Sequence, residues 1–250
     1  MQKIKIVFLG TNGWYDTKTG NTLCVLIETP KEYVILDAGN GIYKIDKYIK
    51  SDKPIYLFIS HFHLDHIVGL HILAKFSFKQ GLNICVQRGG KKFIRSFVNS
   101  PLTASPDELK YKINFIEING KKGQFPFLEN SLLLRHKEPC LGLRFNFNGK
   151  IISFIPDTGL CENAVALAQK ADLLIAESAF RPGQHNIDWP HLNPEDGALI
   201  AKQAGAKKLA LVHFDAAEYP SMKERKLADK CVKGIFKSSF AAIDDQVLFV

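Results

Sequence analysis

The chain has 250 residues, a formal net charge of +8 and five cysteines, and these values already exclude several classes of protein. With 46% hydrophobic and 23% charged residues, it is neither disordered nor fibrous. No apolar run reaches the roughly 18 residues of a membrane-spanning helix, and the N-terminus does not resemble a signal peptide. The cysteines are odd in number and scattered, which argues against a disulfide framework and a cysteine-built zinc site and favours a reducing, cytoplasmic setting.

Strand-like and helix-like segments alternate along the chain, with no Pro/Gly/Ser-rich linker and no repeat. Short apolar runs predict strands over residues 4–9, 23–28, 33–37, 55–59, 83–87, 112–116, 131–134, 141–147, 150–155, 173–176, 208–212 and 246–250. Apolar residues at helical spacing predict helices over residues 42–49, 70–76, 91–97, 161–170, 194–204 and 222–232. The pattern predicts an α/β protein with two sheets packed together and helices outside, in a single domain over residues 1–250.

Two of these elements have clear boundary signals. Asn148-Gly149, between the strands 141–147 and 150–155, is typical of a two-residue hairpin turn. The helix 194–204 has Asn193 as a capping residue, a proline at its first position and Gly205 after its end.

The segment Ser60-His61-Phe62-His63-Leu64-Asp65-His66 carries the strongest functional signal. It places four nitrogen and oxygen donors within six residues, directly after the apolar strand 55–59. Donors of this kind suit two adjacent metal ions, and a coincidental polar loop is a poor explanation of the pattern. We therefore expect His61, His63, Asp65 and His66 to be metal ligands.

Three later residues share one context, because each follows an apolar strand. His136 comes after the strand 131–134, Asp157 lies in a Pro-Asp-Thr-Gly turn, and His213 follows the strand 208–212. Strand ends meet at the edge of a sheet, so these side chains can face one cleft. Each has a structural alternative, such as a turn role for Asp157, but together with the first motif they are expected to be ligands.

With these residues in view, the whole chain resembles a metallo-β-lactamase-fold hydrolase. The family motif H-x-H-x-D-H matches His61, His63, Asp65 and His66, and the segments Phe8-Leu9-Gly10-Thr11 and Leu36-Asp37-Ala38-Gly39 are also typical of the family. The resemblance implies an αβ/βα sandwich with a site for two divalent metal ions, usually Zn²⁺ and sometimes Mn²⁺ or iron.

The resemblance also implies a role for each ligand. One metal ion is expected at His61, His63 and His136, the other at Asp65, His66 and His213, with Asp157 bridging them. A metal-bridging hydroxide would attack the substrate, with Asp65 as its hydrogen-bond acceptor. Asp37 is expected to orient a ligand histidine, although a polar strand end before a glycine turn is the alternative.

A second segment resembles the ribonuclease Z and cyclic phosphate phosphodiesterase branch of the family. His191, just before the helix 194–204, matches the histidine that contacts the phosphate and protonates the leaving oxygen there. Glu177 resembles the acidic residue that orients it. An exposed loop histidine is the structural alternative for His191, and His71 and His185 are expected to be surface or packing residues.

The spacing of the later ligands limits the substrate. Ribonuclease Z enzymes carry a long tRNA-gripping arm between the positions of His136 and Asp157, whereas here this stretch is little more than one hairpin. We therefore expect a phosphodiesterase for a small cyclic phosphate or nucleotide phosphodiester. Alternatives are a tRNA 3′-end-type ribonuclease, a carboxyl or thioester hydrolase such as a lactonase or glyoxalase-like enzyme, and a non-catalytic metal-binding module.

The positive charge is spread thinly and is expected to steer an anion at most. The expected metal site, with two negatively charged ligands around two divalent ions, itself favours a small anionic phosphodiester or an RNA end as partner, and no membrane partner is expected. Homodimers are common in resembling proteins, and a homodimer is considered on that ground alone. Lys91-Lys92-Phe93 with Arg95 and Phe97 is the one stretch that interleaves basic and aromatic residues. The i, i+4 spacing of Phe93 and Phe97 is explained more simply by contacts in the core.

Overall fold

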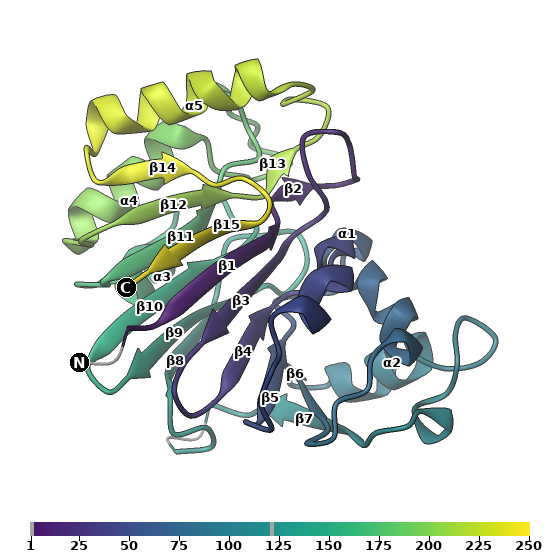
Figure 1. The fold of residues 1–250 in the computed structure, drawn as a ribbon. Coiled ribbons are helices and arrows are strands. Elements are labelled where there is room, and N and C mark those ends of the chain that lie inside the picture. Colours follow the sequence, from purple (N-terminus) through teal and green to yellow (C-terminus); the bar gives the residue numbers. More distant parts are fainter. Residues whose placement is uncertain (1–2, 121–122) are drawn as a thin grey trace. The chain divides into compact units, whose positions relative to one another are not determined.

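The computed structural model describes residues 3–120 and 123–250 (Figure 1). It contains two compact units, each built from segments distant in the sequence. The first holds the described residues of 1–10, 21–119 and 244–249, and the second those of 11–20, 120–243 and 250. The single domain over residues 1–250 stays a prediction.

The first unit is built on a seven-stranded sheet with the order β15-β1-β3-β4-β5-β6-β7. Strands β4 to β7 run parallel, whereas β15, β1, β3 and β4 pair antiparallel. The strands are β1 (Lys5–Gly10), β3 (Cys24–Glu28), β4 (Tyr33–Leu36), β5 (Ile55–Phe58), β6 (Leu82–Gln87), β7 (Ile113–Ile118) and β15 (Gln246–Phe249). The helical segments are η1 (Asn40–Lys47), α1 (Leu64–Ile67), η2 (Val68–Lys75), α2 (Gly90–Phe97) and η3 (Pro106–Glu108).

The core of the first unit explains why its central strands are almost continuously apolar. Side chains such as Leu26, Ile35, Leu57 and Ile84 form one buried cluster with residues of η1, η2 and α2. Parallel strands covered on both faces read as apolar runs rather than as alternating patterns. The strand β5 is buried in this way, and its carboxyl end leads directly into the His61 motif.

The second unit contains a six-stranded sheet with the order β14-β12-β11-β10-β9-β8 and a two-stranded pair, β13-β2. Strands β10, β11, β12 and β14 run parallel, whereas β8, β9 and β10 form antiparallel hairpins. The strands are β2 (Asn12–Gly13), β8 (Leu128–Leu133), β9 (Leu141–Phe147), β10 (Lys150–Ile155), β11 (Leu173–Glu177), β12 (Leu209–Val212), β13 (Phe214–Asp215) and β14 (Ser239–Ala241). The helices are α3 (Glu162–Ala168), α4 (Pro194–Ala204) and α5 (Met222–Ile235), and α5 lies beside α4 and β14 (Figure 1).

The two local boundary predictions are confirmed. Asn148 and Gly149 have φ values of 53° and 89°, as a hairpin turn with two left-handed residues requires. The side chain of Asn193 accepts a hydrogen bond from the Asp196 amide over 2.9 Å, and Gly205 ends α4 with φ of 63°. These residues set where α4 begins and ends, and the segment just before α4 carries His191.

Several short elements differ from the sequence predictions. The helices predicted over 42–49 and 70–76 are 3₁₀ segments, η1 and η2, shifted by about two residues. Strands β2, β13 and β14 and helix α1 have two to four residues, too few for a periodic pattern to develop. Long-range contacts, rather than local preference, determine such elements.

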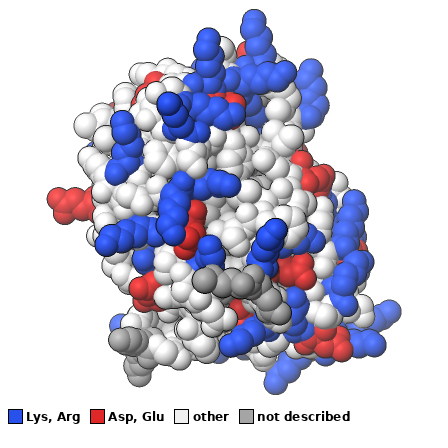
Figure 2. Space-filling view, turned by 60° about the vertical axis from the view of Figure 1, so that its left-hand side comes forward, with Lys and Arg blue, Asp and Glu red and all other residues white. Residues whose placement is uncertain are grey.

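Two surface properties follow from the structure. On the face shown in Figure 2, lysine and arginine side chains are spread over the surface with acidic side chains between them. None of the helices in residues 3–120 and 123–250 combines the length and apolar character needed to span a lipid bilayer. The first observation agrees with the thin spacing of lysines in the sequence.

Candidate functional site

The His61 motif of the first unit forms a tight group of imidazole and carboxylate side chains. The ring centroid of His61 lies 4.6 Å from that of His63 and 4.1 Å from that of His66. Helix α1 begins directly after His63, so Asp65 and His66 lie on its first turn, with Asp65 Oδ2 3.6 Å from His66 Nε2. His61 and His66 are fully buried. The loop therefore gathers its four donors at the carboxyl end of β5.

Asp37, at the end of β4, holds this loop from behind. It is fully buried, and its Oδ2 accepts hydrogen bonds from His66 Nδ1 over 2.8 Å and from Ser60 Oγ over 2.9 Å. Its Oδ1 accepts a third from the Ser60 amide over 2.7 Å. A carboxylate at Nδ1 fixes the ring and leaves Nε2 of His66 for a metal ion. This is the geometry that the expected orienting role needs, and the role itself remains a prediction.

Ser60 extends this support to His61. Its hydroxyl donates to Asp37, so it accepts from Nδ1 of His61 at 3.1 Å. The proton of His61 is thereby held on Nδ1, and Nε2 carries the lone pair. In the sequence, only the place of Ser60 directly before His61 points to this contact.

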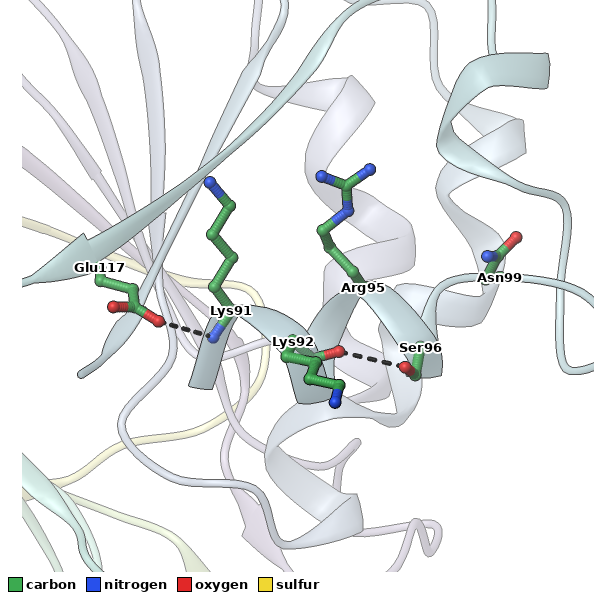
Figure 3. Close-up of a pocket in the computed structure, with 6 residues that line it drawn as sticks. All are labelled: Lys91, Lys92, Arg95, Ser96, Asn99 and Glu117. Carbon is green, nitrogen blue, oxygen red and sulfur yellow. Dashed lines mark hydrogen bonds between the residues drawn. The ribbon is translucent and has the colours of Figure 1, made fainter. Parts of the chain in front are cut away.

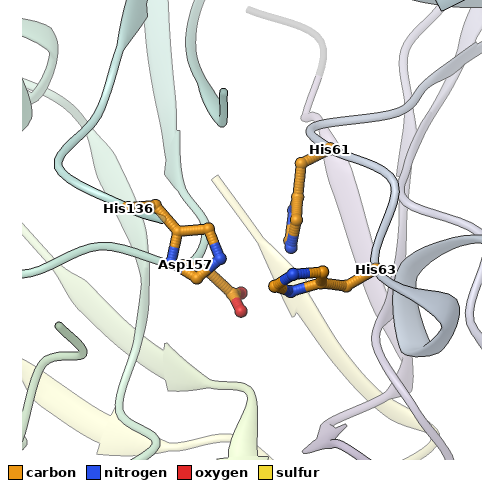
Figure 4. A group of neighbouring side chains, drawn as sticks. All are labelled: His61, His63, His136 and Asp157. Carbon is orange, nitrogen blue, oxygen red and sulfur yellow. The ribbon is translucent and has the colours of Figure 1, made fainter. Parts of the chain in front are cut away.

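The second unit contributes His136, Asp157 and His213. His136 follows β8, Asp157 follows β10, and His213 separates β12 from β13. Nε2 of His213 lies 3.3 Å from Oδ1 of Asp157, and both residues are nearly fully buried. Figure 4 shows His136 and Asp157 of this unit, and His61 and His63 of the first unit, as sticks. The parallel strand ends thus place donor atoms at one edge of the sheet, as the sequence predicts.

His191 and Glu177 form a buried pair in the same unit. Nδ1 of His191 donates to Oε1 of Glu177 over 2.7 Å, and the Glu177 side chain is fully buried at the end of β11. The Glu177 carboxylate also accepts from the amides of Thr158 over 2.8 Å and Ala179 over 2.9 Å. Three donors therefore hold this carboxylate in one orientation, and it in turn fixes the imidazole.

The charges around His191 favour its protonated form. Burial acts against protonation, but the charge and hydrogen bond of Glu177 and the charges of Asp157 and Asp215 outweigh it and raise the pKa of His191 to about 9. Donor atoms of His191, Asp157 and His213 all lie within 4.8 Å of one another. The structure therefore places His191 among ligand-type side chains, not on an exposed loop.

Two further features were missed by sequence reasoning. A Cβ atom added to Gly13 would lie 2.6 Å from Cε1 of His213, so only glycine leaves room for this ring. Asp37 and His213 both have left-handed backbone, with φ of 57° and 54°. Residues other than glycine adopt this conformation rarely and often at functional sites. The fold thus holds both residues in strained positions.

The remaining histidines lie apart from this set. His71 is exposed and its Nδ1 lies 2.6 Å from the Val68 carbonyl oxygen, which it contacts as a hydrogen-bond donor. The side chain of His185 is 66% exposed, and its Nε2 contacts the side chain of Asn193 at 3.2 Å. Both are surface residues, as expected.

The chemistry of the donors fits divalent metal ions. Imidazole nitrogens and carboxylate oxygens are the ligands that zinc, manganese and iron share. His61 and His66 each have one ring nitrogen engaged by Ser60 or Asp37, which is the arrangement found for metal-ligating histidines. No cysteine is needed for this donor set, and Cys24, Cys85 and Cys140 are buried elsewhere.

Comparison with known proteins agrees with this geometry. Residues 33–214 match the family described as the beta-lactamase superfamily domain. Ribonuclease Z from Bacillus licheniformis is 27% identical over 301 aligned residues, covering 96% of this chain and 97% of that protein. Ribonuclease Z from Geobacillus kaustophilus is 25% identical with the same coverage.

Solved structures show the same fold. The metallo-β-lactamase fold protein YhfI from Bacillus subtilis superposes with a TM-score of 0.82 at 20% identity, covering 100% of both chains. The short form of human tRNase Z gives 0.74 at 23% identity over 98% of both chains, and a diphosphatase of the PhnP family gives 0.72 at 14% identity over 98% of this chain and 97% of its own. The predicted α/β metallo-β-lactamase fold class and the prediction of a metal-dependent hydrolase are confirmed. Since the matching segment covers most of the sequence, the chain belongs to the β-lactamase superfamily.

Proposed function

We propose that the protein is a metal-dependent phosphodiesterase that cleaves a small cyclic phosphate or a nucleotide phosphodiester. The observation that carries this proposal is the buried pair of His191 and Glu177 beside Asp157, with His191 Nδ1 4.0 Å from Asp157 Oδ2. The leaving oxygen of an alkyl phosphodiester must gain a proton, and a fixed imidazole can donate it. The pair therefore suits a phosphodiester, whereas a thioester, whose thiolate leaves without protonation, does not need it.

We further propose that two divalent metal ions, Zn²⁺ with Mn²⁺ or iron as alternatives, bind the ligand-type side chains of the chain. The support is the family, the motif and the orientation of His61 and His66 by Ser60 and Asp37. Bound metal ions would polarise the phosphoryl oxygens and activate water at neutral pH. The proposed ligands are His61, His63, Asp65, His66, His136, Asp157 and His213.

The side chains of the protein have separate tasks in this proposal. Asp65 accepts a hydrogen bond from the attacking nucleophile. His191 carries a proton on Nδ1 that stays with Glu177, so its Nε2 is the atom that donates a proton to the leaving oxygen. Glu177 is a positioning residue, because it acts on the substrate only through His191.

The short stretch between His136 and Asp157 supports a small substrate. This stretch forms the hairpin of β9 and β10, whose strands are joined by Asn148 and Gly149. The alignment with ribonuclease Z from Bacillus licheniformis runs over 301 positions, against 250 residues in this chain, so that protein carries residues that this chain lacks. A short hairpin offers no arm for a folded tRNA, and this favours a small or short substrate.

A second candidate is a ribonuclease acting on an RNA 3′ end. The similarity to ribonuclease Z over nearly the full length of both chains favours it. The two candidates share the reaction and differ in how much substrate lies outside the site.

The proposal is tested by loading the purified protein with Zn²⁺ or Mn²⁺ and measuring hydrolysis of bis(p-nitrophenyl) phosphate, 2′,3′-cyclic nucleotides and a tRNA precursor. We expect hydrolysis of the first two, and its loss in Asp65→Ala and His61→Ala. A matched control is His185→Ala, which removes an exposed histidine and should keep the activity. Turnover of lactones or thioesters without phosphodiester cleavage would overturn the assignment, as would metal binding without any hydrolysis.

A further inference from the structure

Helix α2 borders an open depression in the first unit that the proposed reaction does not use. The depression has a volume of about 430 Å³ and lies at one side of the helix (Figure 3). The residues that line it are mostly basic or polar: Lys91, Lys92, Arg95, Ser96, Asn99 and Glu117.

The charge of this surface is positive. Lys91 and Arg95 are one helical turn apart, and Figure 3 shows their side chains extending to the same side, while Lys92 extends to the other. All three are exposed. Glu117 is the only acidic residue among those lining the depression, and its Oε1 accepts hydrogen bonds from the amides of Gly89 over 3.1 Å and Lys91 over 3.3 Å. The negative charge of Glu117 therefore lies at the N-terminal end of α2.

Aromatic contacts connect α2 to the metal-ligand loop. The ring of Phe62, between His61 and His63, packs so closely on Gly90 that an added Cβ would lie 2.4 Å from it. The same ring lies 4.8 Å, centroid to centroid, from the ring of Phe93. Phe93 therefore contacts Phe62, the residue that lies between the proposed ligands His61 and His63.

Phe93 is also the residue for which the core prediction is wrong. Phe97 packs against the core, as predicted, but Phe93 is 47% exposed. Phe93 follows Lys92 directly and lies between Lys91 and Arg95 in the sequence. An exposed ring among cations is the pattern of a surface that stacks bases and contacts phosphates.

We propose that the α2 surface, formed by Lys91, Lys92, Phe93 and Arg95, binds the single-stranded part of a short RNA whose scissile phosphate lies in the metal site. The inference rests on the proposed phosphodiesterase function and narrows its substrate to short oligoribonucleotides. Three cations that line one open depression suit a chain of phosphates better than one phosphate. A base stacks on Phe93, and the α2 surface binds the RNA without a separate tRNA-gripping arm.

The binding test uses fluorescence anisotropy of the metal-loaded protein with a fluorescein-labelled, eight-nucleotide phosphorothioate oligouridylate, which resists cleavage. The variant Lys91→Ala/Lys92→Ala/Arg95→Ala should bind about tenfold more weakly near 0.1 M salt and lower the magnitude of the salt slope by about 2, since each contact with a single strand contributes roughly 0.7. Phe93→Ala should weaken binding at least about fivefold without changing the slope. Alanine preserves the helix.

The matched control removes the same charge from another helix. Lys223, Lys226 and Lys230 are exposed on α5, and Lys223→Ala/Lys226→Ala/Lys230→Ala should leave RNA binding unchanged. Equal weakening by both triple variants would overturn the proposal, because it would show a general effect of net charge. Binding of a twelve-residue polyglutamate as tight as that of RNA would assign the surface to an acidic protein and also overturn it.

A parallel assay separates this inference from the proposed function. This assay uses an unmodified eight-nucleotide oligouridylate. The ratio of its hydrolysis to bis(p-nitrophenyl) phosphate hydrolysis should fall in the α2 triple variant, through a higher KM for the oligonucleotide. If RNA binding depends on α2 but no phosphodiester is hydrolysed, the proposed function is wrong and the α2 surface still binds RNA. If phosphodiesters are hydrolysed but RNA binding does not depend on α2, the proposed function holds and the inference about the α2 surface is wrong.

Discussion

Nδ1 of His191 donates a hydrogen bond of 2.7 Å to Oε1 of Glu177, a carboxylate that is fully buried. The same oxygen accepts from the amide of Thr158, the residue after Asp157. The pair therefore links the proposed proton donor to the turn that carries a proposed metal ligand. This connection makes the role of Glu177 testable apart from its contribution to folding.

Glu177→Gln should lower turnover of a phosphodiester with an alkyl leaving group by about 10²-fold, because a neutral amide no longer holds the proton on His191. Turnover of bis(p-nitrophenyl) phosphate should fall much less, since p-nitrophenolate leaves without protonation. The measurement is the dependence of kcat on the pKa of the leaving group, which a merely structural role would not change. Glu177→Asp should recover part of this dependence.

A matched carboxylate serves as control for this prediction. Glu162 is exposed at the start of α3, and Glu162→Gln should leave the leaving-group dependence as it is in the wild type. If Glu177→Gln slows both substrates equally, Glu177 does not act through proton donation.

Asp37→Asn should weaken metal binding by about 10- to 100-fold, because the carboxylate that orients His66 and, through Ser60, His61 is lost. The amide nitrogen of asparagine offers a donor where Asp37 accepts three hydrogen bonds, so stability should also fall by about 1–3 kcal/mol. Metal content after dialysis against a chelator and the unfolding midpoint measure the two effects. Ser60→Ala removes the link to His61 and one hydrogen bond to Asp37 but leaves His66 held by Asp37, so it should have the smaller effect on metal affinity.

The carboxyl group of Asp172, in the second unit and away from the proposed ligands, should make the stability of the protein depend on pH. Burial acts to raise the pKa of its carboxyl group, but hydrogen bonds from Lys207 and from the Ile151 amide, both 2.8 Å long, and the charges of Lys207 and Lys150 outweigh it and lower the pKa. Because the folded state lowers this pKa, the stabilisation is complete above the ordinary aspartate pKa and is lost as the pH falls through the lowered value.

Asp172→Asn should therefore cost about 1–3 kcal/mol of unfolding free energy at pH 7, and the difference from the wild type should shrink as the pH falls below about 4. Urea denaturation at several pH values measures this. Glu129 pairs with Arg144 at 3.1 Å but is 44% exposed, so Glu129→Gln should change stability little at any pH. A difference for Asp172→Asn that is constant across pH would contradict the explanation.

The parts of the site that the sequence predicts best are those whose residues lie close together in the chain. His61, His63, Asp65 and His66 follow one buried strand, so their convergence needs only the end of β5 and the first turn of α1. The long apolar strands and the capped helix α4 were equally clear, because burial and capping leave local signals.

Features that depend on distant segments left no such signal. Strand β2 has two residues and exists because it pairs with β13, where Asn12 lies opposite Phe214. Arg225, buried in α5, donates to the side chains of Thr11 and Asn12 and so fixes the segment before Gly13. Neither contact has a periodic pattern, and the exposure of Phe93 was mispredicted for a similar reason: i, i+4 spacing gives neighbours on a helix and not the direction of the core.

Gly13→Ala should impair the proposed metal site through this distant contact. The new methyl group would lie 2.6 Å from Cε1 of His213, so the ring must move or β2 must separate from β13. We expect a loss of bound metal and of phosphodiester hydrolysis of at least about tenfold, as for a displaced ligand support. Metal content per protein chain and kcat, measured on the same preparation, check the prediction.

Gly234 is the matched control for Gly13→Ala, because it lies in α5 with no atom within 4 Å of an added Cβ. Gly234→Ala should keep metal and activity and raise stability by about 0.5–1 kcal/mol. Wild-type metal content and activity in Gly13→Ala would show that His213 tolerates the shift and that its fixed position is not required.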